Sequence, residues 1–364
     1  MRVQLKDVAS FSKGKQINGD DLVADGKYAF LNGGINPSGK WHEYNVEGNS
    51  IAISEGGNSC GYVNYMDEPF WCGAHCYFLY DLKYDAKYIY YALKSQQDSI
   101  MQLRSGACMP NIKKNALGEF TFSIEEDSTK QALVVASLDK VSELIALRKV
   151  QLAKLDQLVK ARFVELFGDP MTNSNGYVLK KYGDLFELNA GGTPSKQKSE
   201  YWDNGTISWI GSNMCQNTVI YENDGNYITE EGLKHSSARM FPVDTVLIAL
   251  VGATIGKTAL LKFETTTNQN VLGVRGIRES GYTPEFVFYY TQGLYQKFLD
   301  IGDGGFSMAS KGFISELPVP VVDLALQEQF AAFVERTDKS KLAIQQSLDK
   351  LETLKKSLMQ KYFG

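Results

Sequence analysis

The sequence predicts an α+β fold, in which two β-rich globules are separated by two long antiparallel coiled-coil helices, with a pseudo-twofold internal repeat. Two observations lead to this prediction. Apolar residues recur at alternating steps of four and three in two long stretches, which is the spacing of a heptad seam. The segments before these stretches share one plan of short strand-like runs and glycine turns. We therefore expect the chain to run as globule, helix, globule, helix.

The two helices are expected within 127–168 and from residue 326 to the C-terminus. Both close on an aromatic-glycine pair, Phe167-Gly168 and Phe363-Gly364, and these pairs lie 196 residues apart. A helix of about 40 residues would be roughly 60 Å long, so its seam needs a partner, and the other copy is the nearest one. The plainer alternative is a helical hairpin or a homo-oligomeric coil. The residues expected to pair the helices are Leu138, Val141, Ile145, Leu152, Leu155, Val159, Val334, Ile344, Leu348, Leu351 and Leu358.

The repeat divides the chain into four segments: a globule at 1–115, a helix within 116–170, a globule at 171–315 and a helix within 316–364. Strand-like 207–213 stands where 28–34 stood in the first globule. Gly252 then matches Gly57, and Gly256 matches Gly61 at an offset of 195 residues. A glycine-rich loop at 302–308 parallels 105–109. The second globule therefore repeats the first at greater length.

Length, composition and net charge limit the classes of protein to which the chain can belong. The chain has 364 residues and 43% hydrophobic content, enough for two sizeable cores. Neither a signal peptide nor a membrane-length apolar run is visible, and the five cysteines lack the spacing of a disulfide framework, so we expect a cytoplasmic protein without a membrane partner. A net charge of −4 argues against a free-standing DNA binder. It leaves room for a local basic face, or for partners that supply phosphate contacts.

Catalytic motifs are not visible in the sequence. The segment 252–258 resembles a phosphate loop but has three residues, not four, between its first glycine and the Gly-Lys pair. A tight turn with one basic side chain is the simpler interpretation, and it also suits a loop presented to a DNA backbone. Cys72, His75 and Cys76 have metal-like spacing without a second paired set, so we expect no zinc site. Three scattered histidines do not indicate a hydrolytic triad.

The second half carries a resemblance to a known family. Its residues are the turn at 191–195, the strand end at 209–212, the loop at 252–257 and the Asn-Gln-Asn run at 268–270, together with the passage 318–329. With the duplicated architecture, these resemble the specificity subunit of type I restriction-modification systems. The likeness extends over essentially the whole chain but is clearer in the second half. In the first globule, Tyr62 stands in place of Lys257, and 73–75 stand in place of 268–270.

The resemblance implies a DNA-sequence-specificity subunit that performs no chemistry. Each globule would be a target-recognition domain for one half of a bipartite site in double-stranded DNA, and the helices would set the gap between the halves. Two methyltransferase subunits would dock, one against each repeat, with restriction subunits joining where they are present. No cofactor is expected in this chain. S-adenosylmethionine, ATP and Mg are expected in the partner subunits.

The expected DNA contacts lie in loops. Asparagine and glutamine amides pair with the N6 and N7 atoms of adenine, whereas lysines and backbone amides hold phosphates. A different class of function, a two-headed coiled-coil adaptor for protein or glycan, fits the acidic charge and the many tyrosines, but explains the matched loops less well. An enzyme ranks third. The candidate DNA-binding residues are Asn32, Gly33, Gly34, Gly192, Thr193, Ser212, Asn213, Met214, Thr254, Lys257, Asn268, Gln269 and Asn270.

Overall fold

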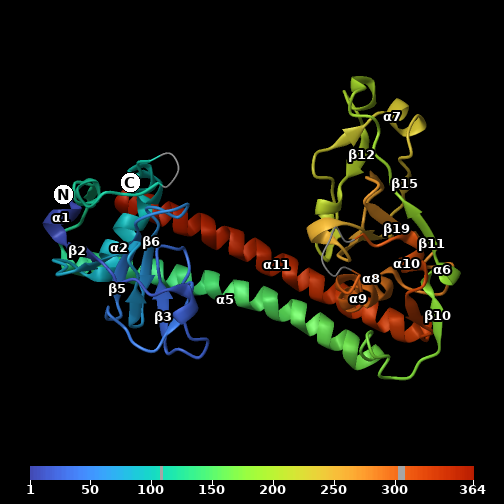
Figure 1. The fold of residues 1–364 in the computed structure, drawn as a ribbon, viewed down its shortest axis with the longest axis horizontal. Helices are drawn as coiled ribbons and strands as arrows, with labels where there is room; N and C mark the ends of the chain where they lie inside the picture. The colour runs from blue at the N-terminus through green and yellow to red at the C-terminus, as the bar shows by residue number, and fades with distance from the viewer. Residues whose placement is uncertain (107–109, 302–307) are drawn as a thin grey trace. The chain divides into compact units, whose positions relative to one another are not determined.

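The computed structural model describes residues 1–106, 110–301 and 308–364. The chain forms two compact units, one comprising Met1–Val150 and Gln345–Gly364, the other comprising Gln151–Ile344 (Figure 1). Cys108, Met109 and most of the glycine-rich loop at 302–308 lie outside the described residues.

The first unit contains two small sheets and a short strand pair. Strands β1 (Arg2–Gln4) and β9 (Thr121–Ser123) pair antiparallel and bring the two ends of the globule together. The four-stranded sheet has the order β2-β8-β5-β6, formed by Ser10–Lys13, Cys76–Tyr80, Ser50–Ser54 and Val63–Met66. The three-stranded sheet has the order β4-β3-β7, formed by Gly39–Trp41, Tyr28–Leu31 and Phe70–Cys72. The helices are α1 (Leu5–Val8), η1 (Gly19–Asp21), α2 (Ala86–Ser95), α3 (Gln97–Gln102) and α4 (Lys114–Gly118).

The second unit repeats this plan with two additional strands, β13 and β15. Strands β10 (Leu179–Lys181) and β20 (Pro318–Pro320) form the closing pair. The larger sheet has the order β11-β19-β16-β17-β13, formed by Glu187–Ala190, Val271–Arg275, Val246–Ala249, Thr258–Leu261 and Thr218–Ile220. The smaller sheet has the order β14-β12-β18-β15, formed by Tyr227–Ile228, Ile207–Ile210, Thr265–Thr267 and Met240–Phe241. The helices are α6 (Tyr182–Leu185), η2 (Ser199–Tyr201), η3 (Ser212–Met214), α7 (Glu230–Lys234), η4 (Gly252–Thr254), α8 (Pro284–Gly293), α9 (Tyr295–Leu299) and α10 (Lys311–Ser315).

Backbone conformation shows the duplication directly. Left-handed residues recur at an interval of 195, and they are glycine, asparagine or aspartate, the residue types that tolerate this conformation. Each pair ends or starts an equivalent strand, so the turns that define the sheets are conserved within the chain. The predicted fold class is confirmed. The pairs are Asn49 with Asp244, Gly57 with Gly252, Gly61 with Gly256, and Asp81 with Gly276.

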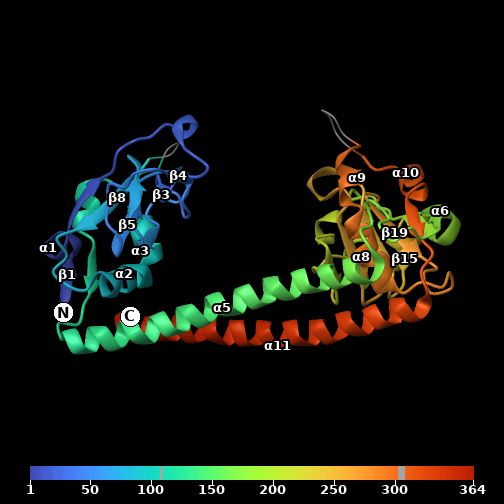
Figure 2. The same ribbon diagram turned by 90° about the horizontal axis from the view of Figure 1, so that it is seen from below.

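Two helices of 40 residues each, α5 (Ser128–Phe167) and α11 (Leu324–Phe363), contribute to both units. In the first unit, the start of α5 and the end of α11 run side by side, and Leu138 and Phe363 are buried in its core (Figure 2). In the second unit, Phe163 and Phe167 near the end of α5 pack edge to face against Phe330 near the start of α11, with ring centroids 5.3 and 5.6 Å apart. The helices are therefore antiparallel within each unit.

The residues expected to pair the helices lie buried or half-buried. Charged residues beside them form ion pairs between the helices, Lys149 with Glu352 at 3.1 Å in the first unit and Lys341 with Asp156 at 2.6 Å in the second. The buried group comprises Leu138, Val141, Val159, Val334 and Leu348, and the half-buried group comprises Ile145, Leu152, Leu155, Ile344, Leu351 and Leu358. Over the described ranges, no helix combines the length and apolarity needed to cross a membrane.

Candidate nucleic-acid interface

The candidate loops of the second unit meet at one edge of its sheets. Antiparallel pairing places Ala249, at the end of β16, opposite Val271, the first residue of β19. It also places Ala190, at the end of β11, opposite Leu272. Strands β12 and β18 are parallel, so both end in the same direction. The loops that follow β11, β12, β16 and β18 consequently gather where β19 begins.

The same backbone frame is present in the first unit. At this edge, three backbone N–H groups donate hydrogen bonds in the same way in both units. The glycine that follows β2 or β11 donates to β8 or β19, and the next residue donates to the last residue of β7 or β18. The residue that follows β7 or β18 donates to the last residue of β3 or β12. In the first unit these hydrogen bonds run from Gly14 to Cys76, Lys15 to Cys72 and Gly73 to Leu31. In the second they run from Gly191 to Val271, Gly192 to Thr267 and Asn268 to Ile210.

Glycine is required where the loops of this frame touch. A β-carbon on Gly14 would lie 1.9 Å from the carbonyl oxygen of Cys72, and one on Gly191 would lie 2.1 Å from Oγ1 of Thr267. Such contacts leave no space for a side chain. The loops of this frame can therefore approach closely.

In the second unit, the structure brings half of the predicted residues together. The Thr193 hydroxyl donates to Oε1 of Gln269 at 2.5 Å, and the carbonyl of Gly192 accepts from the indole of Trp209 at 3.1 Å. Gln269 is exposed, whereas Asn268 and Asn270 are half-buried. Oδ1 of Asn268 accepts from the backbone N–H of Asn270 at 3.0 Å, so this amide stabilises its own turn. Gln269 is thus the member of the run that is best placed to reach a ligand.

The remaining predicted residues of the second unit flank this cluster. Ser212, Asn213 and Met214 form η3 directly after β12, with Asn213 exposed. Nζ of Lys257 donates to Oε1 of Gln216 at 3.0 Å, which ties the loop after β16 to the loop after η3. The hydroxyl of Thr254 donates to the carbonyl of Val251 at 3.3 Å, so it caps its own turn. Lysine and amide groups therefore lie in the loops beside this cluster.

In the first unit, the predicted loop is occupied by internal hydrogen bonds. Oδ1 of Asn32 accepts from the backbone N–H of His75 at 3.1 Å, and its amide donates to Gln16 at 3.4 Å. The carbonyl of Gly33 accepts from the hydroxyls of Ser54 and Ser59, and that of Gly34 accepts from Asn64. Asn32, Gly33 and Gly34 thus hold the frame together in this conformation.

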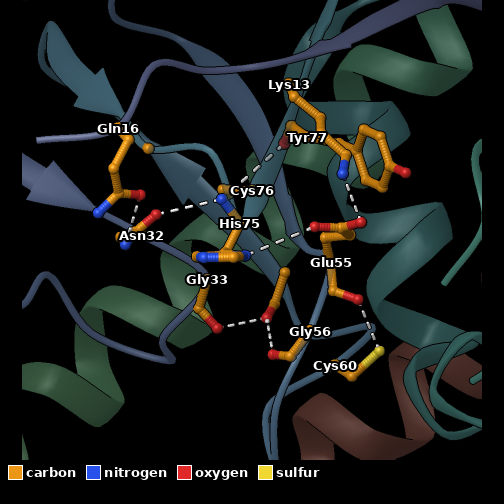
Figure 3. A network of polar contacts seen from close by, with 12 residues as sticks. Lys13, Gln16, Asn32, Gly33, Glu55, Gly56, Cys60, His75, Cys76 and Tyr77 are labelled. Atoms are coloured by element: carbon orange, nitrogen blue, oxygen red, sulfur yellow. Dashed lines mark hydrogen bonds and ion pairs between the residues drawn. The ribbon is translucent and has the colours of Figure 1, made fainter. Parts of the chain in front are cut away.

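The exposed edge of the first unit instead carries a charged cluster of Lys13, Glu55 and His75, which the sequence did not predict (Figure 3). Nζ of Lys13 lies 2.5 Å from one carboxylate oxygen of Glu55, and Nδ1 of His75 lies 3.8 Å from the other. The side chain of Glu55 is 13% exposed, whereas those of Lys13 and His75 are 46% and 64% exposed. The sequence contains one indication of this cluster. Glu55 directly follows an apolar strand, at the position where the second unit has Leu250.

The four cysteines within the described ranges are buried thiols. Cys60, Cys72, Cys76 and Cys215 are all free and buried. Burial raises the pKa of Cys215 to about 12, which keeps it protonated at neutral pH. Within 1–106, 110–301 and 308–364, no group of three or more histidine, cysteine, aspartate or glutamate side chains is arranged to hold a metal ion.

These features define a duplicated α+β protein in which loops gather at one equivalent edge of each repeat. A family model described as the type I restriction modification DNA specificity domain matches residues 1–157 and 175–355. The chain therefore belongs to this family, as the resemblance predicted.

Individual relatives agree with this membership. A Mycoplasma pneumoniae protein assigned as a type I specificity subunit is 30% identical over 223 residues, which are 58% of this chain and 58% of the relative. The EcoR124I/EcoR124II specificity subunit of Escherichia coli is 36% identical over 98 residues, 26% of this chain and 24% of that subunit. These matches span less than two thirds of either relative. The crystal structure of a Mycoplasma genitalium type I restriction-modification S subunit has the same fold, with a TM-score of 0.65, 21% identity and coverage of 100% of this chain and 96% of that one.

Proposed function

We propose that this chain is the DNA-sequence-specificity subunit of a type I restriction-modification complex, and that each unit reads one half of a bipartite site. The reading surface would be the edge at which the loops gather, here called the recognition edge. One observation carries the proposal. The two edges have the same backbone hydrogen bonds but different exposed side chains, Lys13 and His75 in one, Gln269 and Asn213 in the other. A common frame with variable polar side chains is what recognition of two different base sequences requires.

Binding, not catalysis, is the task proposed for the chain. The net charge of −4 fits a subunit whose partners supply much of the contact with DNA phosphates. Two methyltransferase subunits would dock, one against each repeat, because a duplicated chain presents the same surface twice. In this proposal S-adenosylmethionine is bound by the methyltransferase subunits, whereas ATP and Mg are used by restriction subunits where the host has them.

Adenine methylation across the genome of the host, with and without this gene, tests the proposal. The expected result is that deletion abolishes methylation at one split motif while leaving other motifs unchanged. That result would reveal both half-sites and the spacer at once. An unchanged methylome, with the methyltransferase subunit shown to be expressed, would contradict the proposal.

A second experiment separates this function from a protein- or glycan-binding adaptor. The chain, reconstituted with its methyltransferase subunits, should shift double-stranded DNA in a gel, and the affinity should fall steeply with salt because counterions are released. An adaptor would give no such shift at any salt concentration.

A further inference from the structure

The charged cluster of the first unit is built around Glu55, whose backbone is held by hydrogen bonds on both sides. The backbone N–H of Glu55 donates to the carbonyl of His75 at 2.9 Å, and its own carbonyl accepts from the N–H of Ile112 at 2.9 Å. The thiol of Cys60 donates to the same carbonyl at 2.9 Å. Because both sides of its backbone are fixed, the Glu55 side chain leaves the end of β5 in one defined direction.

The basic side chains of Lys13 and His75 cover this carboxylate, one from a strand and the other from a loop. Lys13 reaches it from the end of β2, and its ammonium also lies 5.8 Å from the ring centroid of Tyr77. His75 approaches from the loop between β7 and β8, where the amide of Asn32 holds its backbone. Figure 3 shows Lys13 and His75 reaching different oxygens of the Glu55 carboxylate. The Glu55 carboxylate is therefore largely covered, whereas the Lys13 and His75 side chains remain exposed to solvent.

The free N–H donors of Lys13 indicate which DNA base this cluster would bind. An ammonium group has three N–H donors, so the hydrogen bond from Lys13 to Glu55 leaves others to point outward. Guanine presents two adjacent acceptors, O6 and N7, in the major groove, whereas adenine presents a donor beside its acceptor. A lysine that a carboxylate holds in place can therefore distinguish guanine from adenine. A DNA phosphate also accepts from lysine, but it would carry no sequence information.

We propose that Lys13 contacts a guanine in the half-site read by the first unit, and that Glu55 is the positioning residue that aims it. This inference rests on the proposed function, because it concerns the base that the recognition edge selects. The second unit lacks the cluster, since Leu250 and Asn270 stand at the positions of Glu55 and His75. The effect is consequently confined to one half-site.

Methylation of a DNA library randomised in both half-sites, by the chain reconstituted with its methyltransferase subunits, tests this inference. For Lys13→Met, we expect one guanine position of the first half-site to lose at least about tenfold in selectivity. For Glu55→Gln, we expect partial loss at the same position, because the neutral amide holds the ammonium less strongly. Lys13→Arg should retain the guanine preference, because arginine also donates to O6 and N7. The second half-site should be unchanged in all three variants.

Lys27→Met is the matched control. Lys27 is an exposed lysine of the same unit, but it precedes the start of β3, whereas the recognition edge follows the end of that strand. Its replacement should leave selectivity at every position as it was. Thermal unfolding checks that both variants fold. Lys13→Met should unfold at a lower temperature than Lys27→Met, because it leaves the largely buried Glu55 carboxylate with only His75 beside it.

The outcomes that overturn the inference are distinct from one another. Unchanged selectivity in Lys13→Met, with the split site still recognised, overturns the inference alone. A uniform loss of affinity for all sequences, with a salt dependence reduced by about one ion, identifies a phosphate contact and also overturns it. If the unmodified complex recognises no split site, the proposed function fails, and the inference fails with it.

Discussion

Gln131 and Gln327 occupy equivalent positions at the start of the two long helices, 196 residues apart, and each turns its amide back onto a carbonyl just upstream of its helix. Nε2 of Gln131 donates to the carbonyl of Glu125 at 2.6 Å, and Nε2 of Gln327 donates to that of Val322 at 3.1 Å. Both residues are buried. A buried amide at this point joins the first turn of the helix to the segment that follows the closing strand of its globule.

Replacement of these glutamines by leucine should therefore destabilise the units unequally. Gln131→Leu leaves the carbonyl of Glu125 without its bond and should cost about 1–3 kcal/mol. Gln327→Leu should cost more, because Gln327 also accepts from the N–H of Thr283 at 3.0 Å and donates to Gly281. Denaturant unfolding measures both costs. Equal losses would show that the additional bonds of Gln327 contribute nothing to stability.

The paired left-handed glycines lead to a second prediction. Gly252 and Gly256 have φ angles of 67° and 72°, so alanine at either position is strained by about 1–2 kcal/mol. A β-carbon on Gly252 meets no atom within 4 Å, whereas one on Gly256 would lie 2.5 Å from the buried ring of Phe298. Gly256→Ala should consequently lower the free energy of unfolding more than Gly252→Ala, by about a further 1–3 kcal/mol.

The first unit supplies the internal control for this prediction. A β-carbon on Gly57 meets nothing within 4 Å, and one on Gly61 would lie 2.8 Å from the Cα of Met101. Thermal unfolding of Gly57→Ala and Gly61→Ala should show the same order. An inverted order in either unit would contradict the argument from packing.

The contrast between helices and recognition edge shows which features the sequence could predict. Heptad spacing is a local pattern, so the seam from Leu138 to Val159 was visible without knowledge of the globules. The pairing of Lys13 with Glu55 was not visible, because these residues are 42 positions apart and meet only through the order β2-β8-β5. Strand order is not encoded in the period of apolar residues. The same reason explains why Asn32, a plausible base reader by residue type, is engaged in holding the backbone of His75.

A third prediction concerns pH. Desolvation, reinforced by the nearby charge of Lys355, lowers the pKa of Lys94 to about 8 in the folded protein. Its ammonium donates to the carbonyl of Val63 and to Gln97, both at 2.9 Å. Between this value and the ordinary lysine value of about 10.4, the unfolded chain binds more protons than the folded chain. Stability of the first unit should therefore rise with pH across this window, which is opposite to the behaviour of a lysine in an ion pair.

Lys94→Met should remove this contribution. The difference in the free energy of unfolding between the unmodified protein and the variant should move in favour of the unmodified protein from about pH 8 to about pH 10. Urea unfolding at several pH values measures the difference directly. A difference that stays constant across this range would mean that Lys94 keeps an ordinary pKa.

The last prediction concerns the long helices, which we propose act as a spacer between the half-sites. Insertion of seven residues after Val150 in α5 and after Ile344 in α11 preserves the heptad register and lengthens each helix by about 10 Å. These insertion points coincide with the boundary between the two units. The preferred gap between half-sites should then increase by about three base pairs, because base pairs rise 3.4 Å along DNA. Insertion into α5 alone should weaken DNA recognition without selecting a longer gap, because the two seams would no longer match. Methylation of a library with varied spacers distinguishes these cases, and an unchanged gap after the double insertion would rule out the spacer role.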